Sequence, residues 1–230
     1  LGNLWRFDLS SGNPTQWDNT NRRLSLFSAV GPGGDPQPIT VPPRIALNPE
    51  RPGELMVLFG TGSFFRTGDK NAVSPQIQTL YGLRDAGASV NSSLGTRDDL
   101  LEQTITYETT ASALGTTRIV REVSDNDYTA DDEPGWFLDL AVSGSAEGER
   151  VISRATFPSS STRKRVRFST LRPDADPCSG GREGFIFDLD LSDGSQFDQS
   201  VFDINNDGLF NTMDLVNGKQ ISAISGGFGE

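Results

Sequence analysis

Short apolar runs alternate with glycine- and proline-rich turns along the whole chain. The sequence contains 25 Gly and 13 Pro, and none of the runs has the period of a long amphipathic helix. The run 54–60 is almost continuously apolar, which is typical of an inner strand buried on both faces. The pattern predicts an all-β fold, with strands expected at 43–47, 54–60, 100–108, 117–123, 149–153 and 163–170.

An apolar strand followed by an aspartate and a glycine-containing turn recurs four times. The marker residues are Asp8, Asp85, Asp139 and Asp190, which lie 77, 54 and 51 residues apart. This spacing fits about one four-stranded propeller blade per marker, enlarged by insertions. The alternative is that the four stretches are unrelated hairpins of a β-sandwich. We favour a β-propeller.

The stretch 203–214 has the pattern of a twelve-residue calcium-binding loop. Oxygen-bearing side chains stand at positions 1, 3, 5, 9 and 12, and Gly208 stands at position 6, where a positive φ would permit a sharp turn. Ca²⁺ takes about six to eight oxygen ligands, which alternate residues of a curled loop can supply together. A solvated Asn/Asp/Gly turn is the alternative. The candidate ligands are Asp203, Asn205, Asp207, the backbone carbonyl of Leu209, Asn211 and Asp214.

Position 12 of this loop is Asp214 where glutamate is usual, so either Asn211 or Asp214 would complete the coordination shell. Phe210, at position 8, is expected to pack the loop onto a core. Asn217 and Gly218 should stop any exit helix within about one turn. A lone loop without flanking helices favours a structural staple over a calcium sensor. A dockerin-like module would need a second such loop.

Charge and composition exclude several classes of function. The net charge of −11 argues against binding to nucleic acid and to an anionic membrane surface. The chain contains no histidine, which excludes Ser-His-Asp and Cys-His catalysis and histidine-bound zinc. No apolar run reaches the length of a membrane-spanning helix. Acidity of this kind suits a secreted protein that meets calcium outside the cell.

Three further segments carry charge or thiol chemistry. Residues 124–134 are rich in Asp and Glu and are predicted to form a solvated insertion loop, with a second cation site as the alternative. Residues 163–170 contain four cations, which predicts an exposed outer strand protected against edge pairing; a patch for an acidic partner is the alternative. Cys178 is the sole cysteine, so it is either a buried free thiol or pairs outside this sequence.

The stretch 2–9, Gly-Asn-Leu-Trp-Arg-Phe-Asp-Leu, resembles a blade strand of the PilY family, the calcium-binding factors at type IV pilus tips. Four further segments fit the family pattern in the same order, and together they span nearly the whole chain. The loop at 203–214 lies where the family tends to carry an aspartate-rich calcium loop. The four segments are 60–65, 78–85, 135–140 with 148–151, and 176–181.

The resemblance implies antiparallel four-stranded blades of a modified β-propeller, incomplete in this chain, with residues 1–230 forming one region of later blades. Both ends are expected to be cut from a longer secreted protein. The resemblance further implies a non-enzymatic, calcium-binding module that supports pilus assembly against retraction, adhesion and motility.

By the same resemblance, the expected partners are pilin-like subunits and the rest of the same protein, with host or abiotic surfaces as further candidates. The expected location is the pilus at the cell surface, reached through the periplasm. The alternative function is a propeller enzyme of the quinoprotein or glycoside-hydrolase type, which would need a cofactor or two opposed carboxylates in an axial pocket.

Overall fold

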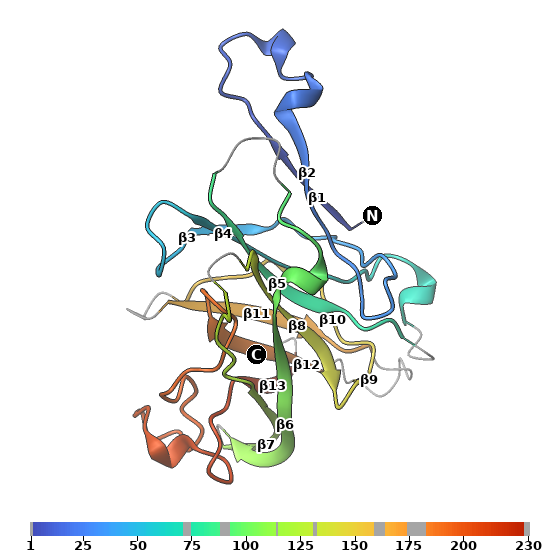
Figure 1. The fold of residues 1–230 in the computed structure, drawn as a ribbon. Helices are drawn as coiled ribbons and strands as arrows, with labels where there is room; N and C mark the ends of the chain where they lie inside the picture. The colour runs from blue at the N-terminus through green and yellow to red at the C-terminus, as the bar shows by residue number, and fades with distance from the viewer. Residues whose placement is uncertain are drawn as a thin grey trace.

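The computed structural model describes residues 2–70, 75–87, 93–113, 115–130, 133–158, 164–173 and 183–227. These residues form thirteen strands and five short 3₁₀ turns, with no α-helix among them (Figure 1). The all-β expectation is confirmed. No helix in this part of the chain has the length and hydropathy needed to cross a lipid bilayer.

Strands between residues 44 and 142 build a four-stranded antiparallel unit in the order β3-β4-β5-β8, which we call unit 1. Its inner strand β4 is buried over five of its six residues, as its continuous apolar run predicted. The short strand β9 pairs with the end of β8. The bounds are β3, Arg44–Leu47; β4, Leu55–Gly60; β5, Thr79–Asp85; β8, Gly135–Val142; and β9, Ser145–Ala146.

The last third of the chain builds a second antiparallel unit in the order β10-β11-β12-β13, which we call unit 2. Phe185 and Phe187 alternate along β12 and are buried, with 1% and 0% of their surface exposed. The bounds are β10, Arg150–Val151; β11, Arg165–Leu171; β12, Glu183–Asp190; and β13, Ala223–Gly227.

A long hairpin joins the two units into one sheet of eleven strands. It consists of β6 (Leu101–Ala113) and β7 (Thr116–Val123), which pair as the sequence predicted. β6 runs parallel to β8 of unit 1, while β7 pairs antiparallel with β13 of unit 2. The parallel pairing is an exception among the pairs of this otherwise antiparallel sheet.

A separate two-stranded arm precedes unit 1 and projects from the body of the molecule (Figure 1). It consists of β1 (Asn3–Phe7) and β2 (Arg23–Ser28), with a β-bulge between Leu4 and Trp5. The 3₁₀ turns are η1 (Pro14–Gln16), η2 (Thr20–Arg22), η3 (Thr67–Lys70), η4 (Arg97–Asp99) and η5 (Thr212–Asp214).

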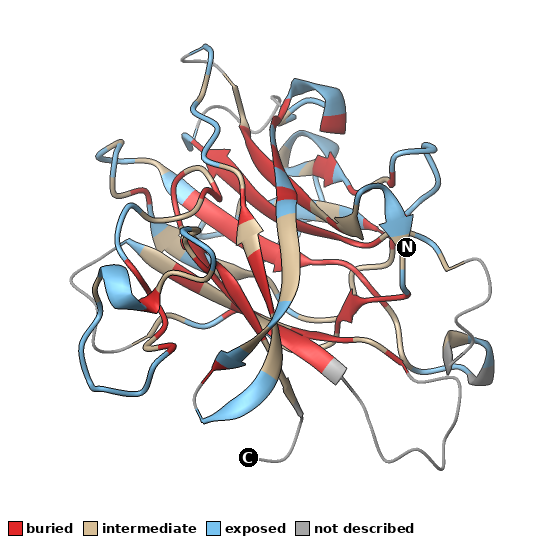
Figure 2. Cartoon of the chain, turned by 90° about the horizontal axis from the view of Figure 1, so that it is seen from below, coloured by how far each residue is buried: buried red, intermediate tan, exposed pale blue. Residues whose placement is uncertain are grey.

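Buried residues concentrate on the strands that cross the middle of the molecule, and exposed residues on the arm and the loops (Figure 2). The largest apolar cluster is shared by the two units: Leu58 and Leu80 come from unit 1, and Val166 and Phe168 come from unit 2. Trp136 of β8 belongs to this cluster and contacts Phe168 edge to face, with ring centroids 6.3 Å apart. The core therefore holds the two units together.

The expectation of one blade per marker aspartate is wrong. Asp85 and Asp139 lie on β5 and β8, which pair directly in unit 1, with Thr79 opposite Asp139. The spacing was misleading because residues 101–123, between these two strands, form the β6–β7 hairpin outside unit 1. The 54 residues from Asp85 to Asp139 therefore contain an insertion and not a complete blade.

The markers do share a local role at strand ends. Asp8, Asp85 and Asp190 each accept a hydrogen bond from the backbone N–H two residues further on, at 2.9, 3.0 and 2.7 Å. This Asx turn ends the strand, as the pattern predicted. Asp139 differs, because β8 continues to Val142 and its carboxylate binds Arg97 at 2.6 Å.

The prediction that 163–170 forms an exposed outer strand is wrong. β11 lies between β10 and β12, and its cations face a buried acid. Asp188 of β12 is fully buried and binds Arg167 through two hydrogen bonds of 2.7 Å. The cationic run therefore neutralises a carboxylate inside the sheet. Residue 163 lies outside the described residues.

Candidate metal centre

The loop 203–214 lies in the long connection between β12 and β13, on the side of unit 2. Its base is anchored by Val201, Phe202 and Ile204, which are 5%, 8% and 6% exposed and pack with Ile221 and Ile224. Burial of these side chains fixes the start of the loop against β13 and β7.

Phe210 does not provide this anchor. Its side chain is 55% exposed, so the prediction that it packs the loop onto a core is wrong. Val201 and Phe202, just before the loop, and Ile204, at its second position, provide the apolar anchor instead. The signal in the sequence was the pair of apolar residues, Val201 and Phe202, immediately before the first ligand position.

The side chains at positions 1, 3 and 5 gather on one side of the turn. One oxygen of Asp203 and the amide oxygen of Asn205 both accept a hydrogen bond from the N–H of Asp207, each at 3.0 Å. Two acceptors on one N–H must lie close together. The Asn205 side-chain amide also donates to Asp207 Oδ2 at 2.9 Å. The structure thus brings together three of the predicted ligands.

Gly208 has the left-handed conformation that the sequence predicted. Its φ is +81°, and a Cβ placed on it would meet nothing within 4 Å, so the requirement is conformational rather than steric. Its N–H donates to Asp203 Oδ2 at 2.8 Å. The N–H of Leu209 donates to Asp207 Oδ1 at 2.8 Å, which curls the chain toward position 7.

Asp214 has a structural role that sequence reasoning missed. Its side chain is buried, with 1% of its surface exposed. One carboxylate oxygen accepts from the N–H of Ile204 at 2.8 Å, and the other accepts from the N–H of Asn211 at 2.8 Å. Asp214 therefore ties the start of the loop to its end. The signal was present in the three-residue spacing from Asn211 to Asp214, which is that of a capping box.

Asn211 caps the 3₁₀ turn η5 by accepting from the N–H of Met213 at 2.7 Å. η5 ends at Asp214, and Val216 then pairs with Lys219 around a turn in which Asn217 and Gly218 both have positive φ. The exit helix is thus a single turn, as predicted.

The loop offers a donor set of the kind that hard cations bind. Carboxylate, amide and carbonyl oxygens are what Ca²⁺ prefers, and no sulfur or imidazole is present among the candidate ligands. Across the described residues no three His, Cys, Asp or Glu side chains form a metal-binding group. The candidate centre combines the carboxylates of Asp203 and Asp207 with the neutral oxygens of Asn205 and Leu209, and with either Asn211 or Asp214. Its donor chemistry fits calcium.

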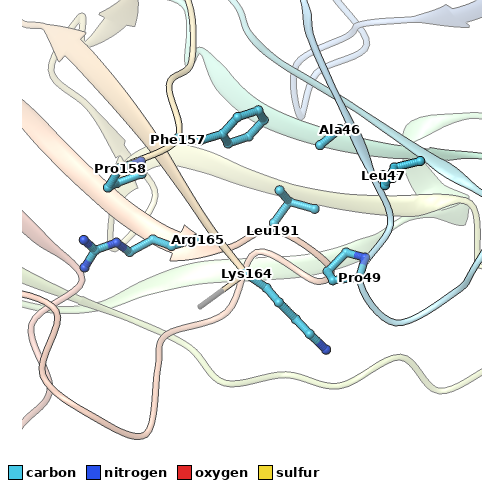
Figure 3. A pocket seen from close by; sticks show the side chains of 8 residues that line it. All are labelled: Ala46, Leu47, Pro49, Phe157, Pro158, Lys164, Arg165 and Leu191. Atoms are coloured by element: carbon cyan, nitrogen blue, oxygen red, sulfur yellow. The ribbon is translucent and has the colours of Figure 1, made fainter. Parts of the chain in front are cut away.

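A shallow groove lies between the β3 edge and the start of β11, with a volume of about 210 Å³. Phe157 and Leu191 face Ala46 across it, while the charged ends of Lys164 and Arg165 point away from these apolar side chains (Figure 3). Its lining holds no carboxylate, hydroxyl, imidazole or thiol. The groove therefore lacks the paired acids of a glycoside hydrolase. It is lined by Ala46, Leu47, Pro49, Phe157, Pro158, Lys164, Arg165 and Leu191.

The acidic segment 124–134 is described at residues 124–130, 133 and 134. Burial first, and then the nearby Asp198, raise the pKa of Asp125. The side chain of Tyr128 is partly buried, and its hydroxyl donates to the carbonyl of Ser192 at 2.7 Å. Part of the segment therefore packs on unit 2 rather than extending into solvent. Asp131, Asp132, Cys178 and the stretch 176–181 lie outside the described residues.

Comparison with known proteins places these features in context. The family model of the PilY1 beta-propeller domain matches residues 1–118. The chain is 32% identical over 252 aligned positions to the type IV pilus biogenesis factor PilY1 of Pseudomonas aeruginosa strain PAO1, covering 98% of this chain and 21% of that protein. It is 32% identical over 200 positions to a PilY1 homolog of Xylella fastidiosa, covering 84% of this chain and 13% of that protein.

The crystal structure of the Pseudomonas aeruginosa PilY1 C-terminal domain superimposes with a TM-score of 0.78 at 27% identity. The match covers 98% of this chain and 50% of that chain. The chain thus spans about a fifth of the length of the first curated relative and half of the solved domain. Together with the propeller family model, this likeness identifies units 1 and 2 as four-stranded blades of a β-propeller that is incomplete in this chain.

Proposed function

The chain belongs to the PilY1 family, and on that premise we propose that it is a calcium-binding, non-enzymatic propeller module of a type IV pilus biogenesis protein. Its relatives are named as pilus biogenesis factors. The proposed module supports pilus assembly against retraction, and with it surface adhesion and twitching motility. The observation that carries the proposal is the preformed loop 203–214 in a chain of this family.

Asp203, Asn205 and Asp207 are the proposed side-chain ligands, and Leu209 is the proposed carbonyl ligand. The convergence of Asp203 and Asn205 on one N–H supports this assignment, because two oxygens are already held side by side. Either Asn211 or Asp214 completes the shell. Both already bind backbone N–H groups of the loop, so each would present oxygens whose positions are fixed.

The proposed role of calcium is to hold the loop closed. Asp203 and Asp207 are both acidic and lie on the same turn, so without a cation their charges repel each other. When bound, Ca²⁺ reverses the sign of the local field. The loop base packs against β13 and β7, so closing the loop would stabilise the junction of unit 2 with the β6–β7 hairpin.

The proposed location is the pilus at the cell surface, and the proposed partners are pilin-like subunits together with the rest of the parent protein. Host and abiotic surfaces are further proposed ligands. We propose no enzymatic function, because the relatives are named as pilus biogenesis factors and no acidic residue lines the groove beside β3.

The test uses the complete polypeptide that carries this chain, with calcium and with the chelator EGTA. Calorimetry should detect calcium binding, and calcium should raise the melting temperature. Asp203→Ala and Asp207→Ala should abolish both effects and reduce surface piliation and twitching in a strain that depends on the protein. Removing a ligand carboxylate weakens the site because Ca²⁺ affinity depends on ligand charge.

The matched control is Asp18→Ala, which removes an acid whose side chain is 96% exposed and lies outside the loop. This variant should retain calcium binding and piliation. No heat of binding, together with a melting temperature that EGTA does not change, would show that the loop is a solvated turn. If both loop variants lose calcium binding but piliation is unchanged, calcium binding is not required for the pilus function.

A further inference from the structure

The arm presents an apolar face to solvent. Side chains alternate along β1, so that Leu4 packs against the cluster around Phe27 and Arg6 binds Asp85. The opposite face of β1 carries Trp5 and Phe7, and Leu9 follows in the turn beyond the strand. All three are exposed aromatic or aliphatic side chains: Trp5 at 49%, Phe7 at 57% and Leu9 at 57%. We call these three residues the arm face.

The arm also has an open strand edge. In the part of the chain that the structure describes, β1 pairs with β2 and with no other strand. An isolated two-stranded hairpin is marginally stable in water, and an exposed strand edge is a template for pairing with further polypeptide. A group of exposed apolar side chains beside such an edge indicates an interaction site.

The arm is held in a fixed position at its base. The guanidinium of Arg6 binds the Asp85 carboxylate at 2.6 Å, which ties β1 to the end of β5. At Gly2 the strand passes so close to the backbone that an added Cβ would lie 2.4 Å from the carbonyl oxygen of Gln37. The arm face is therefore presented in one orientation, and a rigid surface binds without the cost of ordering it.

We propose that the arm face is the docking surface for another blade of the same propeller domain. The solved PilY1 C-terminal domain matches 98% of this chain, yet this match covers 50% of that domain. As much polypeptide again belongs to the domain, and propeller blades stack face to face around a common axis. The occupant is thus a blade from that remaining half, which packs on Trp5, Phe7 and Leu9 and covers the edge of β1.

Hydroxyl-radical footprinting of the wild-type complete polypeptide tests this proposal without any substitution. Two pairs of identical side chains give internal controls for intrinsic reactivity. Phe7 should be oxidised several-fold more slowly than Phe65, which is 80% exposed and lies outside the arm. Trp5 should be oxidised more slowly than Trp17 of the arm tip, although Trp17 is the less exposed of the two here, at 39%.

A variant pair provides the second measurement. Phe7→Asp should lower the melting temperature of the complete polypeptide by several degrees, because a charge would be placed in a buried contact. Phe65→Asp should leave the melting temperature nearly unchanged. Both variants should still bind calcium. Failure of the arm proposal can therefore be distinguished from failure of the proposed calcium site.

Oxidation of Phe7 at the rate of Phe65 would overturn the proposal. Protection that appears only as the protein concentration rises would assign the arm face to a second copy. Protection that requires an added pilin-like protein would assign it to that protein. Each of these two results would also overturn the proposal.

Discussion

Asp190 ends β12 in a partly buried position, and burial raises the pKa of its carboxyl to about 6, with the nearby Asp193 adding to the shift. The folded protein therefore binds a proton between about pH 4 and 6 that the unfolded chain has released, so stability falls as the pH rises through this range. Asp190→Asn should remove this slope. The variant should be more stable than wild type at pH 7, by on the order of 1 kcal/mol, and no more stable below pH 4.

Urea unfolding at a series of pH values measures this effect. The substituted amide would keep an oxygen for the N–H of Ser192, so the strand end should be retained. Asp99→Asn is the control of opposite sign, because the Thr96 N–H lowers the pKa of the Asp99 carboxyl. That variant should lose stability above pH 4. An unchanged slope in Asp190→Asn would show that the carboxyl is ionised normally in the folded state.

For single residues, the sequence predicted those properties that depend on the spacing of nearby residues. Gly208 adopts its positive φ, and Asp203, Asn205 and Asp207 gather, because both properties follow from the order of residues within one turn. The sequence did not predict that Phe210 is exposed or that Asp214 is buried. Those outcomes depend on which side of the loop faces β13, which is decided by residues outside it.

Arg121 of β7 connects three elements through buried contacts. Its guanidinium binds Glu108 of β6 at 2.6 Å and Glu149, just before β10, at 2.5 Å, and it stacks on the ring of Phe185 in β12 at 3.5 Å. Arg121→Met should cost about 3 to 5 kcal/mol, because the Glu149 carboxylate would be left buried with Thr170 as its remaining partner. Chemical denaturation of the variant measures this loss.

A double-mutant cycle separates the ion pair from the packing. Glu149→Gln combined with Arg121→Met should cost less than the sum of the single changes, because no uncompensated charge remains. Arg22→Met is the matched control: its partner Asp8 is partly exposed, so the loss should stay below about 1 kcal/mol. Additive effects of Arg121→Met and Glu149→Gln would contradict the coupling.

Strands were largely predictable, whereas their partners were not. The apolar runs predicted β3, β4 and β7 to within one residue at each end, since period and turn residues are local properties. β6 extends five residues beyond its predicted end at 108. The cationic run of β11 matched the pattern of an edge strand because its neutralising acid, Asp188, stands 21 residues beyond Arg167. The parallel pairing of β6 with β8 also had no signal in the sequence pattern.

Trp136 marks the place where the two units meet. Its indole lies between two glycines: a Cβ on Gly82 of β5 would be 2.3 Å from its Nε1, and a Cβ on Gly194 beyond β12 would be 2.4 Å from its ring. Gly82→Ala should therefore destabilise the whole molecule by about 1 to 3 kcal/mol through overpacking. Thermal unfolding followed by tryptophan fluorescence measures the loss.

Gly12→Ala is the matched control, because a Cβ there meets nothing within 4 Å. Its effect should stay within about 0.5 kcal/mol. A Gly82→Ala variant as stable as Gly12→Ala would show that the indole moves aside at no cost, so that the two units do not depend on this contact.

For the whole molecule, composition and turn density were enough to predict a β fold, and the resemblance of segments such as 2–9 was enough to predict a propeller of the PilY family. The number of strands between markers was not predictable, because Asp85 and Asp139 belong to neighbouring strands while 101–123 passes to unit 2. That residues 1–230 form a single region of later blades, and that the loop 203–214 binds calcium, stay predictions.

The pairing of β7 with β13 also sets an order of events during biosynthesis. Val120 and Arg121 lie opposite Ile224 and Ala223, about 100 residues later in the chain. A polypeptide that emerges from its N-terminus can form the local β6–β7 hairpin at once, but that hairpin must wait for the last strand before its outer edge is covered. Until then the edge of β7 is open to pairing with other nascent chains, so the arrival of β13 removes this route to aggregation.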